Sequence, residues 1–217
     1  MLLELLRNRT SIRNFTGEDI SMDIIKYILE AGRLSPSGGN EQSWRFGVIT
    51  DKDMIKKISE IAYKQKWIES ASFLIVLCTC IVEKERGGRD IQKARFPKFS
   101  EEIESMDSEI YSSLNMEEHQ TKIPGTHMVL AALEQGIAST WVSYFDVDKT
   151  SMLLNLPKEC IASEILAFGY PANKKEPLKK KKLEEITFYN VFDIEKSMVM
   201  SGDEKEVWLY YYWAGGN

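Results

Sequence analysis

The chain has 217 residues, with 28 lysines and arginines against 33 aspartates and glutamates, which gives a formal net charge of −5. Its hydrophobic fraction of 43% and charged fraction of 28% are typical of a globular protein and exclude a mainly disordered, collagen-like or coiled-coil chain. The acidic balance argues against nucleic acid as the main partner, because phosphate binding requires a basic field.

Helices and strands alternate in the first half of the chain. Leucines at helical spacing predict a short helix over 2–8, and a longer helix is predicted to begin at Ser21 and to end near Gly32. The run 35–40, Ser-Pro-Ser-Gly-Gly-Asn, interrupts the helical pattern and predicts a loop. The other elements predicted here are a strand over 44–48, a helix over 52–66 and a fully buried strand over 72–82.

Residues 84–120 differ in composition, since they are rich in charged residues and serine, and we interpret them as a partly helical insertion beside the core. The elements predicted after it are a helix over 126–135 that ends at Gly136, a strand over 139–145, a short helix capped by Asp148 that ends before Pro157, a buried strand over 165–170 and a late strand over 186–192. The buried strands are too few and irregular for a doubly wound sheet. The pattern therefore predicts an α+β fold with a helix-covered sheet, as a single domain over 1–217.

The end of the chain, about 193–217, is interpreted as an aromatic extension of that domain. Trp208, Tyr210, Tyr212 and Trp213 would form a large exposed patch on a monomer. We therefore expect this extension to pack across a dimer.

The three cysteines, Cys78, Cys80 and Cys160, are an odd number, and two of them lie in an apolar run. A disulfide framework is therefore not indicated, and a reducing compartment is expected. With two histidines and neither a CxxC nor an HExxH motif, the sequence indicates no metal site. The apolar run 73–82 is too short to span a bilayer, and the first residues do not resemble a secretion signal, so a cytoplasmic protein without membrane association is expected.

The first candidate binding segment is Arg9-Thr10-Ser11-Ile12-Arg13. In an extended chain alternate residues project to one side, so Arg9, Ser11 and Arg13 would share a face. Two guanidinium groups and a hydroxyl on one face suit a phosphate or another anionic ligand. The alternative is a solvated loop after a helix, since charged side chains are mostly exposed.

The second candidate is the loop that follows the helix from Ser21. Pro36 stiffens this loop, and Gly38 and Gly39 allow its backbone to approach a flat or charged group. Its hydroxyl and amide groups match the polar edge of a heteroaromatic ring better than a metal; they belong to Ser35, Ser37, Asn40 and Gln42. The alternative is an ordinary turn between a helix and a strand.

The third candidate is the lysine run 179–182, which is expected to be solvated unless one lysine folds onto a ligand phosphate. The sequence contains neither a GxGxxG motif after a strand nor a Walker A motif, so a standard nucleotide-binding fold is not indicated. His127 is interpreted as a hydrogen-bonded residue near a helix start rather than as a catalytic base.

Together these segments resemble the FMN-dependent nitroreductase family. The match runs in the family's order through RTSIRNFT, IIKYILEAGRLSPSGGNEQSWRFGVITD, ALEQGIASTWV, ILAFGYP and KKKKLEEI. It leaves out about 84–120 and the end of the chain. The resemblance implies an α-β-α sandwich with a mixed central sheet, and an intertwined homodimer that binds FMN at the subunit interface.

The resemblance also implies which residues hold FMN, with the second loop supplied by the partner subunit. Lys180 takes the place of a phosphate-binding arginine of the family, whereas Leu178 stands where a lysine is common, so Lys179 or Lys182 is expected to substitute. The implied cofactor-binding residues are Arg9, Thr10, Ser11, Arg13, Ser35, Pro36, Ser37, Gly38, Asn40, Gln42, Trp141, Val142, Ser143, Lys180 and Lys182.

The resemblance implies ping-pong hydride transfer from NADH or NADPH, through FMN, to an electron-poor acceptor such as a nitroaromatic compound or a quinone. No side chain is assigned as catalytic, because the flavin carries the redox chemistry, and Arg13 is the candidate cation that tunes it. Phe96, Phe99 and Tyr111 of the insertion are candidate substrate contacts, although the insertion can equally be a solvated helical hairpin. The alternatives are a specialised family member, either a reductive dehalogenase or a flavin-modifying enzyme, and a non-catalytic flavin-binding protein.

Overall fold

The structure, a computed structural model, describes residues 2–80, 88–107, 110 and 121–192. The chain divides into two compact units, Met1–Pro177 and Leu178–Asn217. Among the helices of the described part, none combines the length and apolar character needed to cross a membrane.

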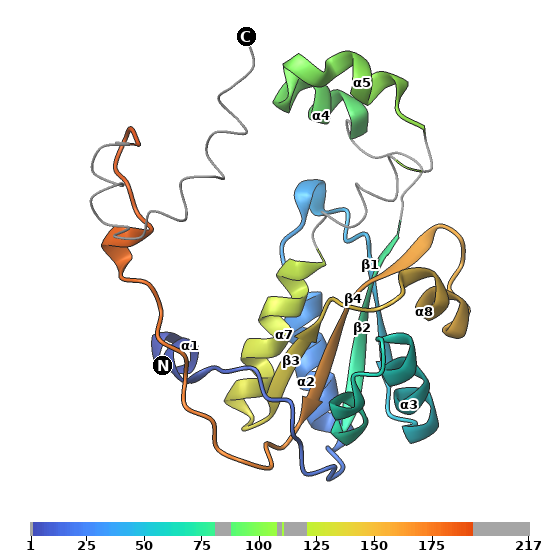
Figure 1. The fold of residues 1–217 in the computed structure, drawn as a ribbon, viewed down its shortest axis with the longest axis vertical. Helices are drawn as coiled ribbons and strands as arrows, with labels where there is room; N and C mark the ends of the chain where they lie inside the picture. The colour runs from blue at the N-terminus through green and yellow to red at the C-terminus, as the bar shows by residue number, and fades with distance from the viewer. Residues whose placement is uncertain (1, 81–87, 108–109, 111–120, 193–217) are drawn as a thin grey trace. The chain divides into compact units, whose positions relative to one another are not determined.

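The first unit contains the sheet and most of the helices (Figure 1). The strands are β1 Trp44–Ile49, β2 Phe73–Cys80, β3 Ala138–Val142 and β4 Cys160–Gly169. The described α-helices of this unit outside the insertion are α1 Leu2–Asn8, α2 Met22–Arg33, α3 Lys52–Ile61, α7 Lys122–Glu134 and α8 Val147–Leu153. Two short 3₁₀ helices, η1 Gly38–Asn40 and η2 Lys66–Ser70, precede β1 and β2.

The sheet has the strand order β1-β2-β4-β3, and each neighbouring pair of these four strands is antiparallel. The α+β class is confirmed, but the mixed sheet that the resemblance implies is not what these four strands form. The parallel pairing in the described residues is limited to a single bridge between Ser11 and Ser139.

Helices cover both faces of the sheet, which confirms the α-β-α layering (Figure 1). On β2, Phe73, Ile75 and Leu77 pack in one cluster with residues of α2 and α7. The intervening residues of β2, such as Leu74 and Val76, pack in a second cluster with residues of α3. A strand buried on both faces reads as a continuous apolar run, and this is why the sequence marks β2 so clearly.

Two predicted helix boundaries differ from those in the structure, and the backbone and hydrogen bonds at the helix ends explain both differences. The helix predicted over 52–66 ends at Ile61, because Tyr63 and Lys64 adopt left-handed backbone angles, with φ of +53° and +63°. The short helix α8 is capped by Asp146 rather than Asp148: the Asp146 carboxylate accepts the Lys149 N–H at 2.9 Å.

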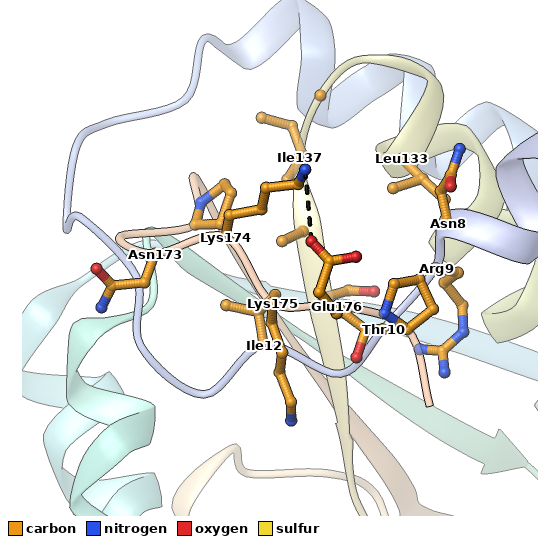
Figure 2. A pocket seen from close by; sticks show the side chains of 15 residues that line it. Asn8, Arg9, Thr10, Ile12, Leu133, Ile137, Asn173, Lys174, Lys175 and Glu176 are labelled. Atoms are coloured by element: carbon orange, nitrogen blue, oxygen red, sulfur yellow. Dashed lines mark ion pairs between the residues drawn. The ribbon is translucent and has the colours of Figure 1, made fainter. Parts of the chain in front are cut away.

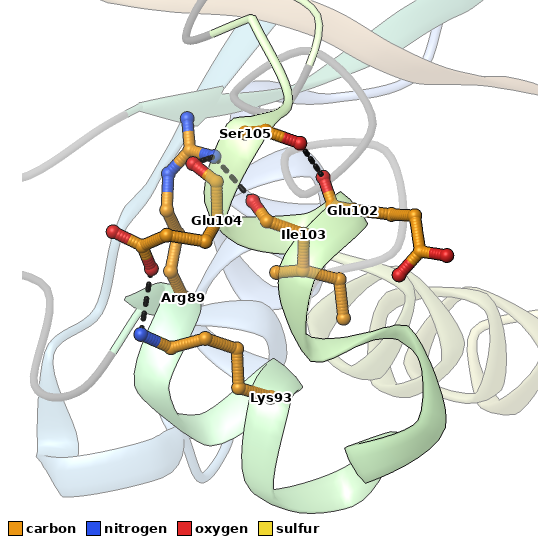
Figure 3. Close-up of polar contacts among 6 residues, drawn as sticks. All are labelled: Arg89, Lys93, Glu102, Ile103, Glu104 and Ser105. Atoms are coloured by element: carbon orange, nitrogen blue, oxygen red, sulfur yellow. Dashed lines mark hydrogen bonds and ion pairs between the residues drawn. The ribbon is translucent and has the colours of Figure 1, made fainter.

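The insertion contains α4 Gly88–Arg95, η3 Pro97–Phe99 and α5 Ser100–Ser105, which confirms its partly helical character. Figure 3 shows how α4 and α5 are joined: the Arg89 guanidinium donates to the carbonyls of Ile103 and Glu104, and Lys93 Nζ lies 2.6 Å from a Glu104 carboxylate oxygen. These charged contacts hold one short helix against the other.

The described part of the second unit, 178–192, contains one 3₁₀ turn, η4 Leu183–Glu185. The late strand predicted over 186–192 is therefore wrong for these residues, which form bends and irregular backbone. Tyr189 and Val191 are strongly exposed, and Phe188 packs edge-on against Phe192. Among the described residues of this unit, 178–192, there is no neighbouring strand, so the apolar alternation has no ladder to join there. The aromatic extension, 193–217, lies outside the described residues.

A disulfide joins Cys80 at the end of β2 to Cys160 at the start of β4. The inference from the odd cysteine count, that no disulfide is indicated, is therefore wrong for this pair. The two cysteines are 80 residues apart in sequence and become neighbours only through the antiparallel pairing of β2 with β4. Cys78 is a free, buried thiol, as its apolar setting predicts.

Candidate functional site

The segment Arg9–Arg13 lies in an extended conformation beside the first residues of β3. The Ile12 N–H donates to the Ser139 carbonyl at 3.3 Å, and the Thr140 hydroxyl donates to the Ile12 carbonyl. Ile12 is buried while Arg13 is exposed, so the alternation of sides that the sequence predicts is present at these two positions. The hydrogen bonds and the buried Ile12 fix the path of the segment.

A cavity of about 410 Å³ lies next to this segment, within the size range of small-molecule sites (Figure 2). Three parts of the chain form its wall: the end of α1 with the segment that follows, the turn from α7 into β3, and the loop 171–177 after β4. The lining residues are Asn8, Arg9, Thr10, Ile12, Leu133, Gly136, Ile137, Ala138, Ser139, Pro171, Asn173, Lys174, Lys175, Glu176 and Pro177.

Two lysines that line this cavity, Lys174 and Lys175, were not predicted from the sequence, which points instead to the longer lysine run 179–182. Lys175 Nζ donates to the Ser11 carbonyl at 3.3 Å, which ties the loop 171–177 to the first segment. Lys174 Nζ lies 3.5 Å from a Glu176 carboxylate oxygen, and both side chains are strongly exposed, so this pair contributes little to stability (Figure 2). The signal for both lysines is the Lys-Lys pair directly after the YPAN turn.

The first segment divides between two environments. Arg9 and Thr10 line the cavity, whereas Ser11 and Arg13 are not among its lining residues. The Arg13 guanidinium lies instead 5.8 Å from the centre of the Trp67 ring, in the range of a cation–π contact. The single face that the spacing predicts for Arg9, Ser11 and Arg13 is thus not built around this cavity.

The second loop, from Ser35 to Gln42, is held by its own hydrogen bonds. The Ser37 hydroxyl accepts the Gln42 N–H at 3.0 Å, and the Gln42 amide nitrogen donates to Asn40 Oδ1 at 3.2 Å. Asn40 and Gln42 have φ values of +58° and +50°, and Gly39 between Ser37 and Asn40 has +59°. Left-handed angles at non-glycine residues are uncommon and concentrate at functional sites and tight turns.

Ser35 connects this loop to helix α7. Its side chain is only 5% exposed, and its hydroxyl lies 2.7 Å from His127 Nδ1 and donates to the Ala31 carbonyl at 3.3 Å. His127 is thus hydrogen-bonded, as predicted. It lies one turn or more inside α7, because the helix begins at Lys122 rather than at 126.

The end of β3 carries a further group of residues that the resemblance implies at the cofactor, Trp141, Val142 and Ser143. Trp141 is half-buried and packs over Gly125 of α7, where a Cβ atom would lie 2.5 Å from the indole ring. Val142 is buried in the core. Ser143 is exposed, and its hydroxyl donates to Glu164 Oε2 at 2.7 Å.

Glu164 is a buried carboxylate that sequence reasoning missed. It lies in β4, its side chain is 7% exposed, and Lys122 Nζ of α7 is 3.5 Å from its second oxygen. The pairing of β2 with β4 shifts register here, from Leu77 opposite Glu164 to Cys78 opposite Ala162. Such bulges redirect side chains and are common beside functional sites.

Two tyrosines form an exposed stacked pair next to Ser143. The rings of Tyr63 and Tyr144 have centroids 4.3 Å apart, and the residues are 54% and 68% exposed. The Gln65 amide donates to the Tyr144 carbonyl at 2.8 Å, which fixes the turn after β3. Flat ligands stack well on such rings, so this pair is a further candidate contact that sequence reasoning missed.

The remaining predicted residues are not placed at the cavity. Lys180 and Lys182 are exposed residues of the second unit, where Lys182 precedes η4. Phe96 and Phe99 are half-exposed in the insertion, each with a neighbouring cation, Arg95 or Lys98, over its ring. Tyr111 lies outside the described residues. Pro36 and Gly38 belong to the second loop described above.

The positions of the cavity, the Ser35 loop and Trp141 can be compared along helix α7. The cavity includes Leu133, near the end of α7, whereas Ser35 contacts His127 and Trp141 contacts Gly125, both nearer its start. At 1.5 Å per residue, Leu133 and His127 are about 9 Å apart along the helix. The structure thus places Arg9 and Thr10 at one end of α7, and the Ser35 loop with Trp141 and Ser143 toward the other.

Comparison with known proteins finds several that are similar to this chain. A protein of Archaeoglobus fulgidus, whose name joins NADH dehydrogenase with NAD(P)H nitroreductase, is 28% identical over 178 residues, which cover 80% of this chain and 87% of the relative. The Bacillus subtilis protein YcnD, described as a hypothetical oxidoreductase, has a TM-score of 0.73 at 22% identity and covers 91% of this chain and 77% of its own. The NADPH:FMN oxidoreductase of Vibrio harveyi, solved with NAD+, has a TM-score of 0.68 at 18% identity and covers 100% and 92%.

The two solved structures establish a shared fold, and the family model goes further. The model of the nitroreductase family matches residues 6–170, which include the Arg9–Arg13 segment, the Ser35 loop and all four strands. A match over this much of the chain assigns the family without reference to any one relative. The chain belongs to the nitroreductase family.

Proposed function

We propose that this chain catalyses ping-pong hydride transfer from NADH or NADPH, through FMN, to an electron-poor acceptor such as a nitroaromatic compound or a quinone. Its broader class, an FMN-dependent NAD(P)H oxidoreductase, follows from its family. The names of similar proteins support the donor and the cofactor, since one is an NADPH:FMN oxidoreductase and another carries NAD(P)H nitroreductase in its name. The observation that carries the proposal is the cavity beside Arg9 and Thr10.

The lining of this cavity fits FMN in its chemistry. A phosphate requires cations, and Arg9 and Lys175 supply them. Ribityl hydroxyl groups require neutral donors and acceptors, which Thr10 and Asn173 offer, and a flat ring system requires apolar walls, which Ile12 and other apolar residues of the lining offer. One cavity therefore combines the three kinds of surface that the cofactor needs.

The chain's own contribution is to bind and orient the cofactor. FMN, when bound, supplies the ring that accepts and donates hydride. The hydrogen bonds from Ile12 and Thr140 keep the first segment rigid, so Arg9 and Thr10 are presented without loss of backbone entropy on binding. The role of Arg13 as a cation at the edge of the ring stays a prediction from the resemblance, because Arg13 is not among the residues that line this cavity.

The second loop supports a site shared between two copies of the chain. Within one chain the Ser35 loop and the Arg9 segment lie toward opposite ends of α7. We propose that a homodimer brings the loop of one subunit to the first segment of the other. Leu2, Leu3 and Leu6 of α1 are exposed and would be covered by such a dimer. The insertion and the aromatic extension are assigned to the same single domain in this proposal.

An absorbance measurement tests the proposal directly. Purified protein with excess FMN, after removal of unbound cofactor, is expected to keep a flavin spectrum, and anaerobic addition of NADH or NADPH should bleach it. A nitroaromatic compound or a quinone should then restore the absorbance. Flavin that neither nucleotide bleaches would overturn the donor assignment, and protein that stays colourless would overturn the cofactor assignment.

The variant Arg9→Gln tests the role of the cavity in FMN binding separately from the rest of the fold. A charge-assisted hydrogen bond contributes roughly 1.5–3 kcal/mol, so this change should weaken FMN binding about ten- to hundredfold. Arg33→Gln is the matched control, because Arg33 is exposed and pairs with Glu30 at 2.7 Å, away from the cavity lining. Equal FMN affinities of the two variants would exclude Arg9 from the cofactor site.

A further inference from the structure

We propose that Cys80 and Cys160 form a site of reversible thiol–disulfide exchange with small thiols. The proposal does not depend on the flavin function. It starts from the position of the pair: Cys80 is the last residue of β2, Cys160 is the first residue of β4, and the two are direct partners in the antiparallel ladder.

The backbone places the two sulfur atoms face to face in either redox state. The Cys80 N–H donates to the Ser43 carbonyl at 2.9 Å, and the Cys160 N–H donates to the Pro157 carbonyl at 2.8 Å, so neither N–H is directed at the other cysteine. In antiparallel sheets such non-hydrogen-bonded partners approach most closely, with Cα atoms typically about 4.5 Å apart. The Cα atoms here are 4.0 Å apart. Two thiols at this position would stay in contact, so breaking and re-forming the bond requires no shift of the strands.

The core does not depend on the bond. Strand β2 is an interior strand, which pairs with β1 over 74–79 along one edge and with β4 over 73–80 along the other. Reduction removes a covalent link between two strands that the ladder already joins. Both cysteines are partly exposed at the ends of their strands, so a small thiol can reach them.

The exchange is a balanced two-electron reaction. A thiolate RS⁻ attacks one sulfur of the Cys80–Cys160 disulfide, forms a mixed disulfide and releases the other cysteine as a thiolate, which takes up a proton. A second RS⁻ then attacks the mixed disulfide. Two RSH are oxidised to RSSR, and the protein disulfide is reduced to two thiols; the reverse reaction consumes RSSR. The co-reactant is thus a low-molecular-weight thiol–disulfide couple, of which glutathione is the probe.

Cys78 is excluded from the reaction by its position. It is buried, and burial raises the pKa of its thiol to about 11, so little thiolate is present at neutral pH. It also lies two residues from Cys80 on the same strand, about 6.6 Å along the chain, whereas bridged Cβ atoms are only about 3.5–4.5 Å apart. The site therefore consists of Cys80 and Cys160.

A redox titration of the full-length protein tests the proposal. The protein is equilibrated anaerobically in mixtures of reduced and oxidised glutathione, from excess of one to excess of the other, and free thiols are trapped by alkylation and located by mass spectrometry. Cys80 and Cys160 are expected to change together in one transition, while Cys78 reacts only after denaturation and the far-ultraviolet circular dichroism stays constant. A pair that remains oxidised in excess reduced glutathione would be a permanent cross-link and would overturn the proposal. So would a pair that remains reduced in excess oxidised glutathione.

One single variant tests whether a small thiol reacts at Cys80, and a second single variant serves as its control. Cys160→Ser leaves Cys80 without its partner, so oxidised glutathione should give one mixed disulfide at Cys80. Cys78→Ser is the matched control and should keep the wild-type transition. Absence of the adduct on Cys160→Ser would show that small thiols do not reach Cys80 and would contradict the proposal, and the wild-type titration decides the question if that variant does not fold.

Discussion

The buried carboxylate of Glu164 leads to an unusual prediction: Ser143→Ala should destabilise the protein more than Glu164→Gln. Its close partner is the Ser143 hydroxyl at 2.7 Å, and its other partner is Lys122 at 3.5 Å, with a lysine side chain that is 57% exposed. Ser143→Ala leaves a nearly buried carboxylate without its close donor, and an unsatisfied buried group costs roughly 1–3 kcal/mol. We therefore expect about 2 kcal/mol of destabilisation from a change at an exposed serine.

Glu164→Gln should cost less. The amide oxygen still accepts the Ser143 hydroxyl, and the half-exposed Lys122 can turn to solvent, so the loss is that of a largely exposed ion pair, about 0–1 kcal/mol. In the Glu164→Gln background, Ser143→Ala removes only a neutral hydrogen bond, about 1 kcal/mol. A double-mutant cycle should thus give a coupling energy of about 1 kcal/mol between the two residues.

Urea denaturation at neutral pH, analysed with a common slope m, measures these differences. Lys122→Met is the control for the weaker partner and should stay within about 1 kcal/mol of the wild type. The reasoning fails if Glu164→Gln destabilises the protein more than Ser143→Ala. That result would make the charge pair with Lys122, rather than the Ser143 hydroxyl, the main partner of the carboxylate.

Three further changes test the packing and the helix caps. Gly125→Ala would place a Cβ atom 2.5 Å from the Trp141 ring, so we expect about 1–3 kcal/mol of destabilisation and a changed tryptophan fluorescence spectrum; an unchanged spectrum would show that the ring does not lie there. Asp51→Ala removes the side chain that accepts the Met54 N–H at 2.8 Å, and a loss of about 1 kcal/mol in urea denaturation is expected. The hydrogen bonds and the charge of Lys149 lower the pKa of Asp146 below the usual 3.8. The ionised Asp146 carboxylate therefore stabilises the fold fully above pH 3.8, and this stabilisation is lost as the pH falls through the lower pKa of the folded state. Asp146→Asn should therefore reduce the acid dependence of the urea midpoint, and a variant with the wild-type pH profile would refute this assignment.

The fold could be predicted wherever short-range patterns decide it. Helix α2 follows from its Ser21 cap and the apolar residues at helical spacing, and β2 from a continuous apolar run. The start of α7 was missed because Pro124 and Gly125 suggest a break. Proline is tolerated in the first turn of a helix, and the glycine makes room for Trp141. A tertiary contact thus explains a residue that looks locally unfavourable.

The candidate site was predicted in its separate segments but not in its assembly. The first segment and the second loop could be recognised because each is contiguous in sequence and rich in polar groups. The first segment and the second loop lie toward opposite ends of α7 because of the way this helix packs, and no local sequence pattern predicts that packing. Lys175 was missed for a similar reason: its contact with the Ser11 carbonyl joins residues 164 positions apart.

The bulge in β4 accounts for the residues that sequence reasoning missed at the end of the sheet. The prediction begins this strand at Ile165, after the polar residues Ser163 and Glu164. The strand begins five residues earlier, at Cys160, and the register shift at Leu77 and Cys78 turns the polar residues toward partners rather than into the core. Ser163 Oγ then lies 2.5 Å from the Thr79 hydroxyl oxygen, and Glu164 faces Ser143 and Lys122. One extra residue in a strand thus produces both a satisfied polar cluster and the alignment of Cys80 with Cys160, and neither can be inferred from a pattern that treats β4 as a regular strand.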